Sequence, residues 1–94
     1  MNKPALLLAV QAALDGDWAQ SHNIAQDYSD DVTNANMANW IHAVLHKIEG
    51  DVWNSKYWYA RTNINGGAGK NYEDFSDARD ELIAIQCRLN NPTY

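Results

Sequence analysis

Apolar residues recur along most of the chain at intervals of three and four, the spacing at which side chains share one face of an α-helix. The pattern is clearest in the middle of the chain, where six apolar residues cover three successive turns. This stripe consists of Met37, Trp40, Ile41, Val44, Leu45 and Ile48. It predicts a helix that ends at Gly50 and turns one apolar face toward a core.

Similar patterns predict four more helices, over residues 5–14, 18–28, 52–61 and 72–90. We expect Asp17 to cap the second helix, Asp31 or Thr33 to cap the third, and Asp51 to cap the fourth. Residues 62–71 contain three glycines and no periodicity, so they are expected to form a flexible loop. The sequence thus predicts an all-α fold, in a single domain over residues 1–94, with two antiparallel helix pairs and a C-terminal capping helix at 72–90.

The two predicted pairs repeat each other. Their turns, Gly16-Asp17 and Gly50-Asp51, are separated by the period of tetratricopeptide repeats, about 34 residues. Around the second turn, Gly50, Ser55 and Tyr59 resemble the turn, the small residue and the groove-filling aromatic of that family. The resemblance extends over residues 5–62 and implies stacked helix pairs that act as a binding surface or scaffold.

Three further stretches resemble a family of short bacterial proteins. They are Ser21–Gln26, Trp40–His46 and Tyr57–Tyr59, and this second resemblance implies no activity. The tetratricopeptide resemblance would place large apolar side chains at the positions of Asn39, His42 and His46. These three residues are therefore the ones that the repeat does not explain.

Charge and composition exclude several classes of partner. The formal net charge is −5, with 12 acidic and 7 basic residues and no Lys/Arg cluster. Nucleic acids and anionic membranes both need such a cluster, so neither is expected as a partner. No apolar stretch approaches the length of a membrane span. The single cysteine, Cys87, is expected to be a small buried residue and fits a protein of the reducing cytoplasm.

Histidines are the first candidates for chemistry. His42 and His46 are four residues apart, so their side chains should lie on one face of a helix. That is half of a helical zinc site, and His22, Glu49 or Asp51 would be a third ligand if the second helix packs beside the third. The alternative is that the histidines are polar packing residues, each hydrogen-bonded to a carboxylate or carbonyl group.

Aromatic residues are the second set. Trp53, Tyr57, Trp58 and Tyr59 point around more than half of one short helix, so we expect at least one of them, Trp58 or Tyr57, to reach the surface. Exposed tryptophan and tyrosine side chains are typical anchors of protein interfaces.

The leading hypothesis is therefore a small cytoplasmic protein–protein interaction or scaffolding module without a cofactor or catalytic residues. Its predicted binding residues are Trp40, His42, His46, Tyr57 and Trp58. The alternative is a metal-binding protein or enzyme built on His22, His42 and His46. A two-repeat array leaves its end faces uncovered, so a homodimer is an alternative to a monomer.

Overall fold

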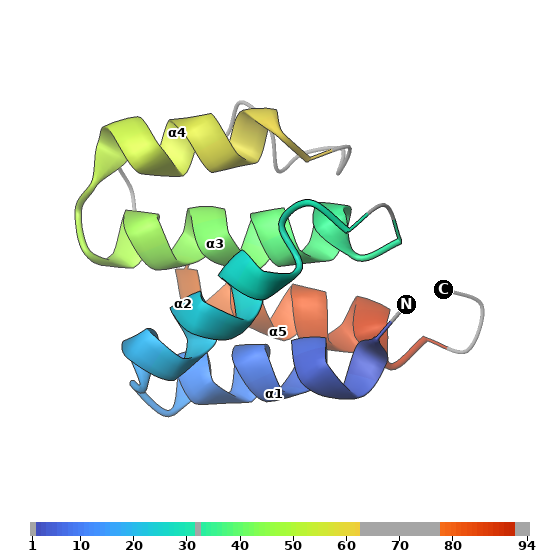
Figure 1. The fold of residues 1–94 in the computed structure, drawn as a ribbon. Helices are drawn as coiled ribbons and strands as arrows, with labels where there is room; N and C mark the ends of the chain where they lie inside the picture. Colours follow the sequence, from blue (N-terminus) through green and yellow to red (C-terminus); the bar gives the residue numbers. More distant parts are fainter. Residues whose placement is uncertain (1, 32, 63–77, 92–94) are drawn as a thin grey trace.

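The computed structural model of the protein describes residues 2–31, 33–62 and 78–91. All regular structure in these residues is helical, which confirms the predicted all-α class. The helices are α1 (Lys3–Leu14), α2 (Trp18–Asp27), α3 (Ala35–Ile48), α4 (Val52–Ala60) and α5 (Ala78–Leu89). The first four form two consecutive hairpins, and α5 packs against α1 and α3 (Figure 1).

Each hairpin turns on a glycine with positive φ, 85° at Gly16 and 79° at Gly50. In both turns the next residue donates its backbone N–H to the carbonyl oxygen five residues earlier, at 2.8 Å for Asp17 and 2.9 Å for Asp51. The same aspartate side chain then accepts a bond from the backbone N–H three residues later, at 3.3 and 3.2 Å. Both predicted caps are confirmed, and the two turns have the same hydrogen bonds at equivalent positions.

The predicted cap of α3 is wrong. Its N-cap residue is Asn34, whose side chain makes no capping hydrogen bond. Asp31 instead accepts bonds from the backbone N–H and the hydroxyl of Thr33, at 2.9 and 2.8 Å. The Asn34 side chain accepts a 2.6 Å bond from the backbone N–H of Asn2. These side chains therefore stabilise the turn before α3 and the start of the chain.

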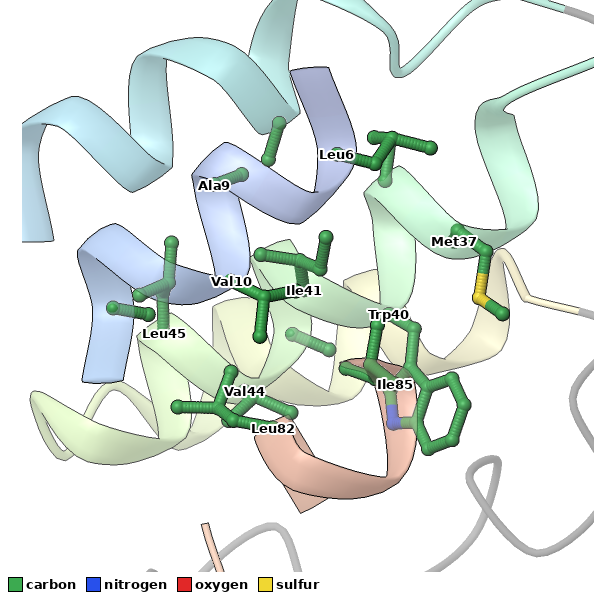
Figure 2. Packing of buried hydrophobic residues seen from close by; sticks show 14 of the residues in the cluster. Leu6, Ala9, Val10, Met37, Trp40, Ile41, Val44, Leu45, Leu82 and Ile85 are labelled. Atoms are coloured by element: carbon green, nitrogen blue, oxygen red, sulfur yellow. The ribbon is translucent and has the colours of Figure 1, made fainter. Parts of the chain in front are cut away.

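The core lies between α1, α3 and α5 (Figure 2). The central apolar stripe is buried as predicted, apart from Ile48, which is half-buried. It meets apolar side chains from the other two helices, among them Leu6, Val10, Leu82 and Ile85. Because four helices pack against α3, the side opposite its apolar stripe is covered too. His42, Asn39 and Lys47 are all buried as a result.

Thr62, the first residue of the predicted loop, lies outside the helices and is buried, and its hydroxyl donates a 2.8 Å bond to the Tyr59 carbonyl oxygen. One prediction for the C-terminal part of the chain is wrong. Cys87 is exposed and not buried, because α5 turns Ile85 and Leu89 toward the core and Cys87 away from it. The rest of the predicted loop and the first turns of the predicted last helix lie outside the described residues. None of the five described helices has the length and apolar composition needed to cross a lipid bilayer.

Candidate functional site

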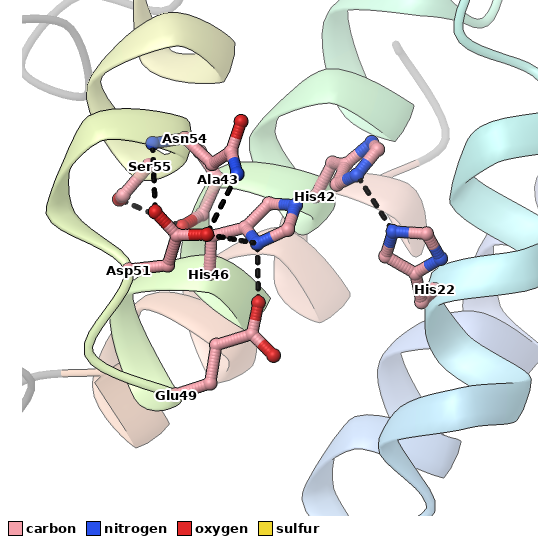
Figure 3. A network of polar contacts seen from close by, with 8 residues as sticks. All are labelled: His22, His42, Ala43, His46, Glu49, Asp51, Asn54 and Ser55. Carbon is pink, nitrogen blue, oxygen red and sulfur yellow. Dashed lines mark hydrogen bonds and ion pairs between the residues drawn. The ribbon is translucent and has the colours of Figure 1, made fainter.

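Three histidines meet where α2 packs against α3 (Figure 3). His42 and His46 lie on one face of α3 as predicted, with stacked rings whose centroids are 4.9 Å apart. His22 approaches from α2, and its Nε2 atom lies 3.0 Å from Nε2 of His42. One ring nitrogen from each of the three residues can be chosen so that all lie within 4.8 Å of one another.

His42 is the buried member of this three-histidine cluster. Its side chain is 1% exposed, and its ring stacks on Trp58 with centroids 4.0 Å apart. Burial lowers the pKa of His42 to about 3, and the neighbouring His22 and His46 contribute to this shift. His42 is therefore a neutral imidazole at physiological pH, able to offer a nitrogen lone pair. Its Nδ1 is buried and has no hydrogen-bond partner among the described residues.

Two carboxylates lie beside the third histidine. Nδ1 of His46 contacts the Glu49 carboxylate and lies 3.9 Å from Oδ2 of Asp51. Asp51 is held in place by Asn54, whose side-chain amide donates to it at 2.6 Å. The hydrogen bonds from Asn54 lower the pKa of the Asp51 carboxyl, which therefore stays ionised at neutral pH. The arrangement fixes the His46 ring and places negative charge behind it.

A cavity of about 370 Å³ leads to the cluster from the surface. His22 and Glu49 are part of its wall, and Trp18, which is about half exposed, lies at its edge. A small ion or molecule in this cavity therefore reaches the His22 imidazole.

The five predicted binding residues do not share one exposed surface. Trp40 is 5% exposed and faces α5, where its Nε1 atom donates a 3.0 Å bond to the Glu81 carboxylate. His42 is buried, as described above. Both were predicted to lie on a binding surface, and both are packed in the interior because α3 is covered on every side. The structure does bring His42, His46 and Trp58 together, and Tyr57 contacts Trp58 edge to face at 5.0 Å.

The outer face of α4 carries the exposed aromatics. Tyr57 is 42% exposed, in agreement with the prediction, whereas Trp58 is partly buried against the core. Trp53 is the most exposed of the four at 73%, and it was not among the predicted binding residues. A signal was present: Ser55 and Tyr59, the two buried residues of α4, define its inner face, and Trp53 lies two residues before Ser55.

No protein-family model, curated protein or solved structure matches this chain. The described residues form an all-α fold of two helix hairpins and a fifth packing helix, with histidines clustered between the hairpins. The residues of the chain itself are therefore the basis for assigning its function.

Proposed function

We propose that the protein is a small cytoplasmic protein–protein interaction or scaffolding module, built on tetratricopeptide-like helix pairs. The repeated turn hydrogen bonds at Asp17 and Asp51 support the proposed likeness. The observation that carries the proposal is the exposure of Trp53 and Tyr57 on the outer face of α4. Large aromatic side chains of this kind, left in water by the isolated chain, are typical interface anchors.

The geometry of this outer face favours a protein partner. Among the described helices α4 packs mainly against α3, which leaves its other side uncovered by them (Figure 1). Trp53 and Tyr57 stack with their rings 5.8 Å apart and within 12° of parallel. Together with Lys56 and Ala60 they line a shallow hollow of about 280 Å³. A hollow of this size accepts a side chain or two of a partner.

The charges on this face also restrict the class of partner. The chain as a whole is acidic, but the outer face of α4 carries the basic side chains of Lys56 and Arg61. The Arg61 guanidinium lies 5.4 Å from the centre of the Tyr57 ring, which gives it a fixed place beside the aromatic pair. The complementary partner is a segment that presents apolar and acidic side chains together.

A site-specific crosslinking experiment tests the proposal. Two variants are compared, one with a photo-crosslinking residue at position 53 and one with it at the exposed position 20 on α2. In cells that produce the protein, only the variant at position 53 should capture a partner. The captured protein is then purified and its affinity measured. Trp53→Ala should weaken binding by about 30-fold or more, as expected of an interface anchor, and Gln20→Ala should not.

Two results would count against the module. One is equal affinity of the wild-type protein and Trp53→Ala for the captured protein. The other is loss of folding in Trp53→Ala, since a side chain that is 73% exposed should not stabilise the core. Light scattering of the same variants also tests the alternative of a homodimer: dimerisation through this face predicts a wild-type dimer and a Trp53→Ala monomer.

A further inference from the structure

We infer that His22, His42 and His46 form a binding site for a divalent first-row transition-metal ion such as zinc, which would bridge α2 and α3. This site is separate from the α4 outer face and does not depend on the proposed function. Four features support it: the spacing of the ring nitrogens, the state of the imidazoles, the carboxylates behind them and access from the surface.

The spacing of the ring nitrogens fits a metal ion. In a tetrahedral zinc site with Zn–N bonds of 2.0–2.1 Å, neighbouring ligand nitrogens lie about 3.3 Å apart. Nε2 of His22 and Nε2 of His42 are 3.0 Å apart, close to that edge length. A ring nitrogen of His46 completes a set with one nitrogen from each of the three residues, all within 4.8 Å of one another. The two elements that carry these residues are already packed together, so the site needs no rearrangement of helices.

The chemical state of the ligands is also suitable. Metal ions bind neutral imidazole, and buried His42 is neutral at any physiological pH. A hydrogen bond between two imidazoles joins the N–H of one ring to the lone pair of the other, so it links only two of the three rings. A metal ion would instead accept one lone pair from each of the three rings. Imidazole ligands select zinc, copper or nickel over magnesium and calcium, which prefer oxygen.

The surroundings resemble the outer shell of a metal site. Nδ1 of His46 contacts the Glu49 carboxylate, with ionised Asp51 at 3.9 Å, so Nε2 is the ring nitrogen that would face the ion (Figure 3). A carboxylate on the far nitrogen orients such a ligand and raises its basicity. The cavity lined by His22 and Glu49 opens the His22 side of the cluster to small molecules.

The test uses tag-free protein and Zn²⁺ alone. We expect calorimetry to show saturable binding of one Zn²⁺ per chain, a melting temperature that rises with Zn²⁺ concentration, and reversal by a chelator. Mg²⁺ should have no effect. Cobalt substitution should give the strong visible absorption of a tetrahedral nitrogen site. Absence of saturable Zn²⁺ binding to the wild-type protein would overturn the inference.

Variants identify the ligands. His22 is half-buried on α2 of the first hairpin, so His22→Ala should keep the fold, checked by circular dichroism, and lose saturable Zn²⁺ binding. Asn23→Ala is the matched control: it is the next residue on α2, lines the same cavity and should bind Zn²⁺ like the wild type. If His22→Ala fails to fold, His22→Gln takes its place with the same expectation.

A second group of candidate ligands makes the test sharper. His46, Glu49 and Asp51 also place three ligand atoms within 4.8 Å of one another. With Glu49 as an outer-shell residue, Glu49→Gln should weaken Zn²⁺ binding about tenfold and leave it saturable. If Glu49→Gln abolishes binding while His22→Ala retains it, the ion belongs to the second group and the three-histidine site is wrong. In either case Trp53→Ala should bind Zn²⁺ normally, so this result is separable from the test of the α4 face.

Discussion

The ammonium group of Lys47, whose side chain is fully buried on α3, forms an ion pair with the Glu81 carboxylate of α5. The same carboxylate accepts a 2.7 Å bond from the Tyr59 hydroxyl of α4 and a 3.0 Å bond from Nε1 of Trp40. One acidic side chain thus receives three donors and links α5 to both helices of the second hairpin. A buried charge of this kind is tolerated only while its partner is present.

Glu81→Gln should therefore destabilise the fold. The amide can still accept a hydrogen bond from Trp40 or Tyr59, but it carries no charge and so cannot form the ion pair with the buried Lys47 ammonium group. We expect the free energy of unfolding, measured by urea denaturation, to fall by about 3 kcal/mol. Asp80→Asn, at the exposed neighbouring position, should change it by no more than about 0.5 kcal/mol.

A double variant without either charge distinguishes loss of the Lys47–Glu81 ion pair from a general packing defect. Lys47→Met combined with Glu81→Gln removes both charges of this ion pair, so the double variant should be more stable than Glu81→Gln alone. Equal stability of the wild type and Glu81→Gln would show that the ion pair contributes nothing.

The pairing of Lys47 with Glu81 also marks the limit of prediction from the sequence. Periodicity assigns residues to faces of a helix, and it placed the stripe from Met37 to Ile48 correctly. It does not say how many helices surround that one. Since α1, α2, α4 and α5 all pack around α3, Lys47 and His42 are buried on a helix that looked amphipathic.

For the candidate site too, the local features were predictable from the sequence and the packing between helices was not. Local rules fixed the two glycine turns, the caps at Asp17 and Asp51, and the shared face of His42 and His46. The approach of His22 depends on how α2 packs against α3, which the sequence left conditional. The exposure of Trp53 depends on which side of α4 faces α3, and the small residue Ser55 is the position that marks this inner face.

Acidification should destabilise the protein through His42. Its pKa falls from the ordinary 6.5 to about 3 on folding, first because of burial and then because His22 and His46 lie beside it. Between these values the unfolded chain binds one more proton than the folded chain. Stability is therefore complete above pH 6.5 and is lost as the pH falls through this window, by up to about 1.4 kcal/mol per pH unit. Urea denaturation should show a loss of about 2 kcal/mol between pH 7 and pH 5.

A variant and a direct titration separate His42 from other groups. In His42→Gln the loss of stability between pH 7 and pH 5 should be smaller, whatever the stability of the variant at pH 7. In the wild-type protein, the ring proton resonances of His42 should show no protonation step down to pH 5. A protonation step near pH 6.5 would contradict the prediction.

The turn glycines should resist substitution for a reason of backbone conformation. Gly16 and Gly50 have φ of 85° and 79°, and a Cβ added to either would meet no atom within 4 Å. Gly50→Ala should thus lower the free energy of unfolding by about 1 kcal/mol through backbone strain alone. Gly50→Asn should lower it less, because asparagine tolerates positive φ better than alanine. If both variants lose the same amount, side-chain space and not φ sets the cost.

The equivalent serines of the two hairpins should differ in how much their hydroxyl groups contribute to stability. Ser21 and Ser55 occupy the same position after their respective turns, and both are fully buried. The Ser55 hydroxyl donates a 2.8 Å bond to the Ala43 carbonyl oxygen, whereas the Ser21 hydroxyl has no hydrogen-bond partner among the described residues. Ser55→Ala should lower the free energy of unfolding by about 1 kcal/mol, and Ser21→Ala should leave it unchanged or raise it, because it removes a polar group that is buried without a partner.

Urea denaturation of the two alanine variants side by side measures this difference, with each serine position acting as the control for the other. Both changes remove the same oxygen atom from a fully buried site, so a difference between them reports the hydrogen bond and not the volume. Equal losses would mean that the Ser21 hydroxyl also has an acceptor. The carbonyl group of Ala9 would then be the first to consider, since Ala9 holds the place in the first hairpin that Ala43 holds in the second. The two hairpins would in that case be equivalent in this bond as they are in their turns.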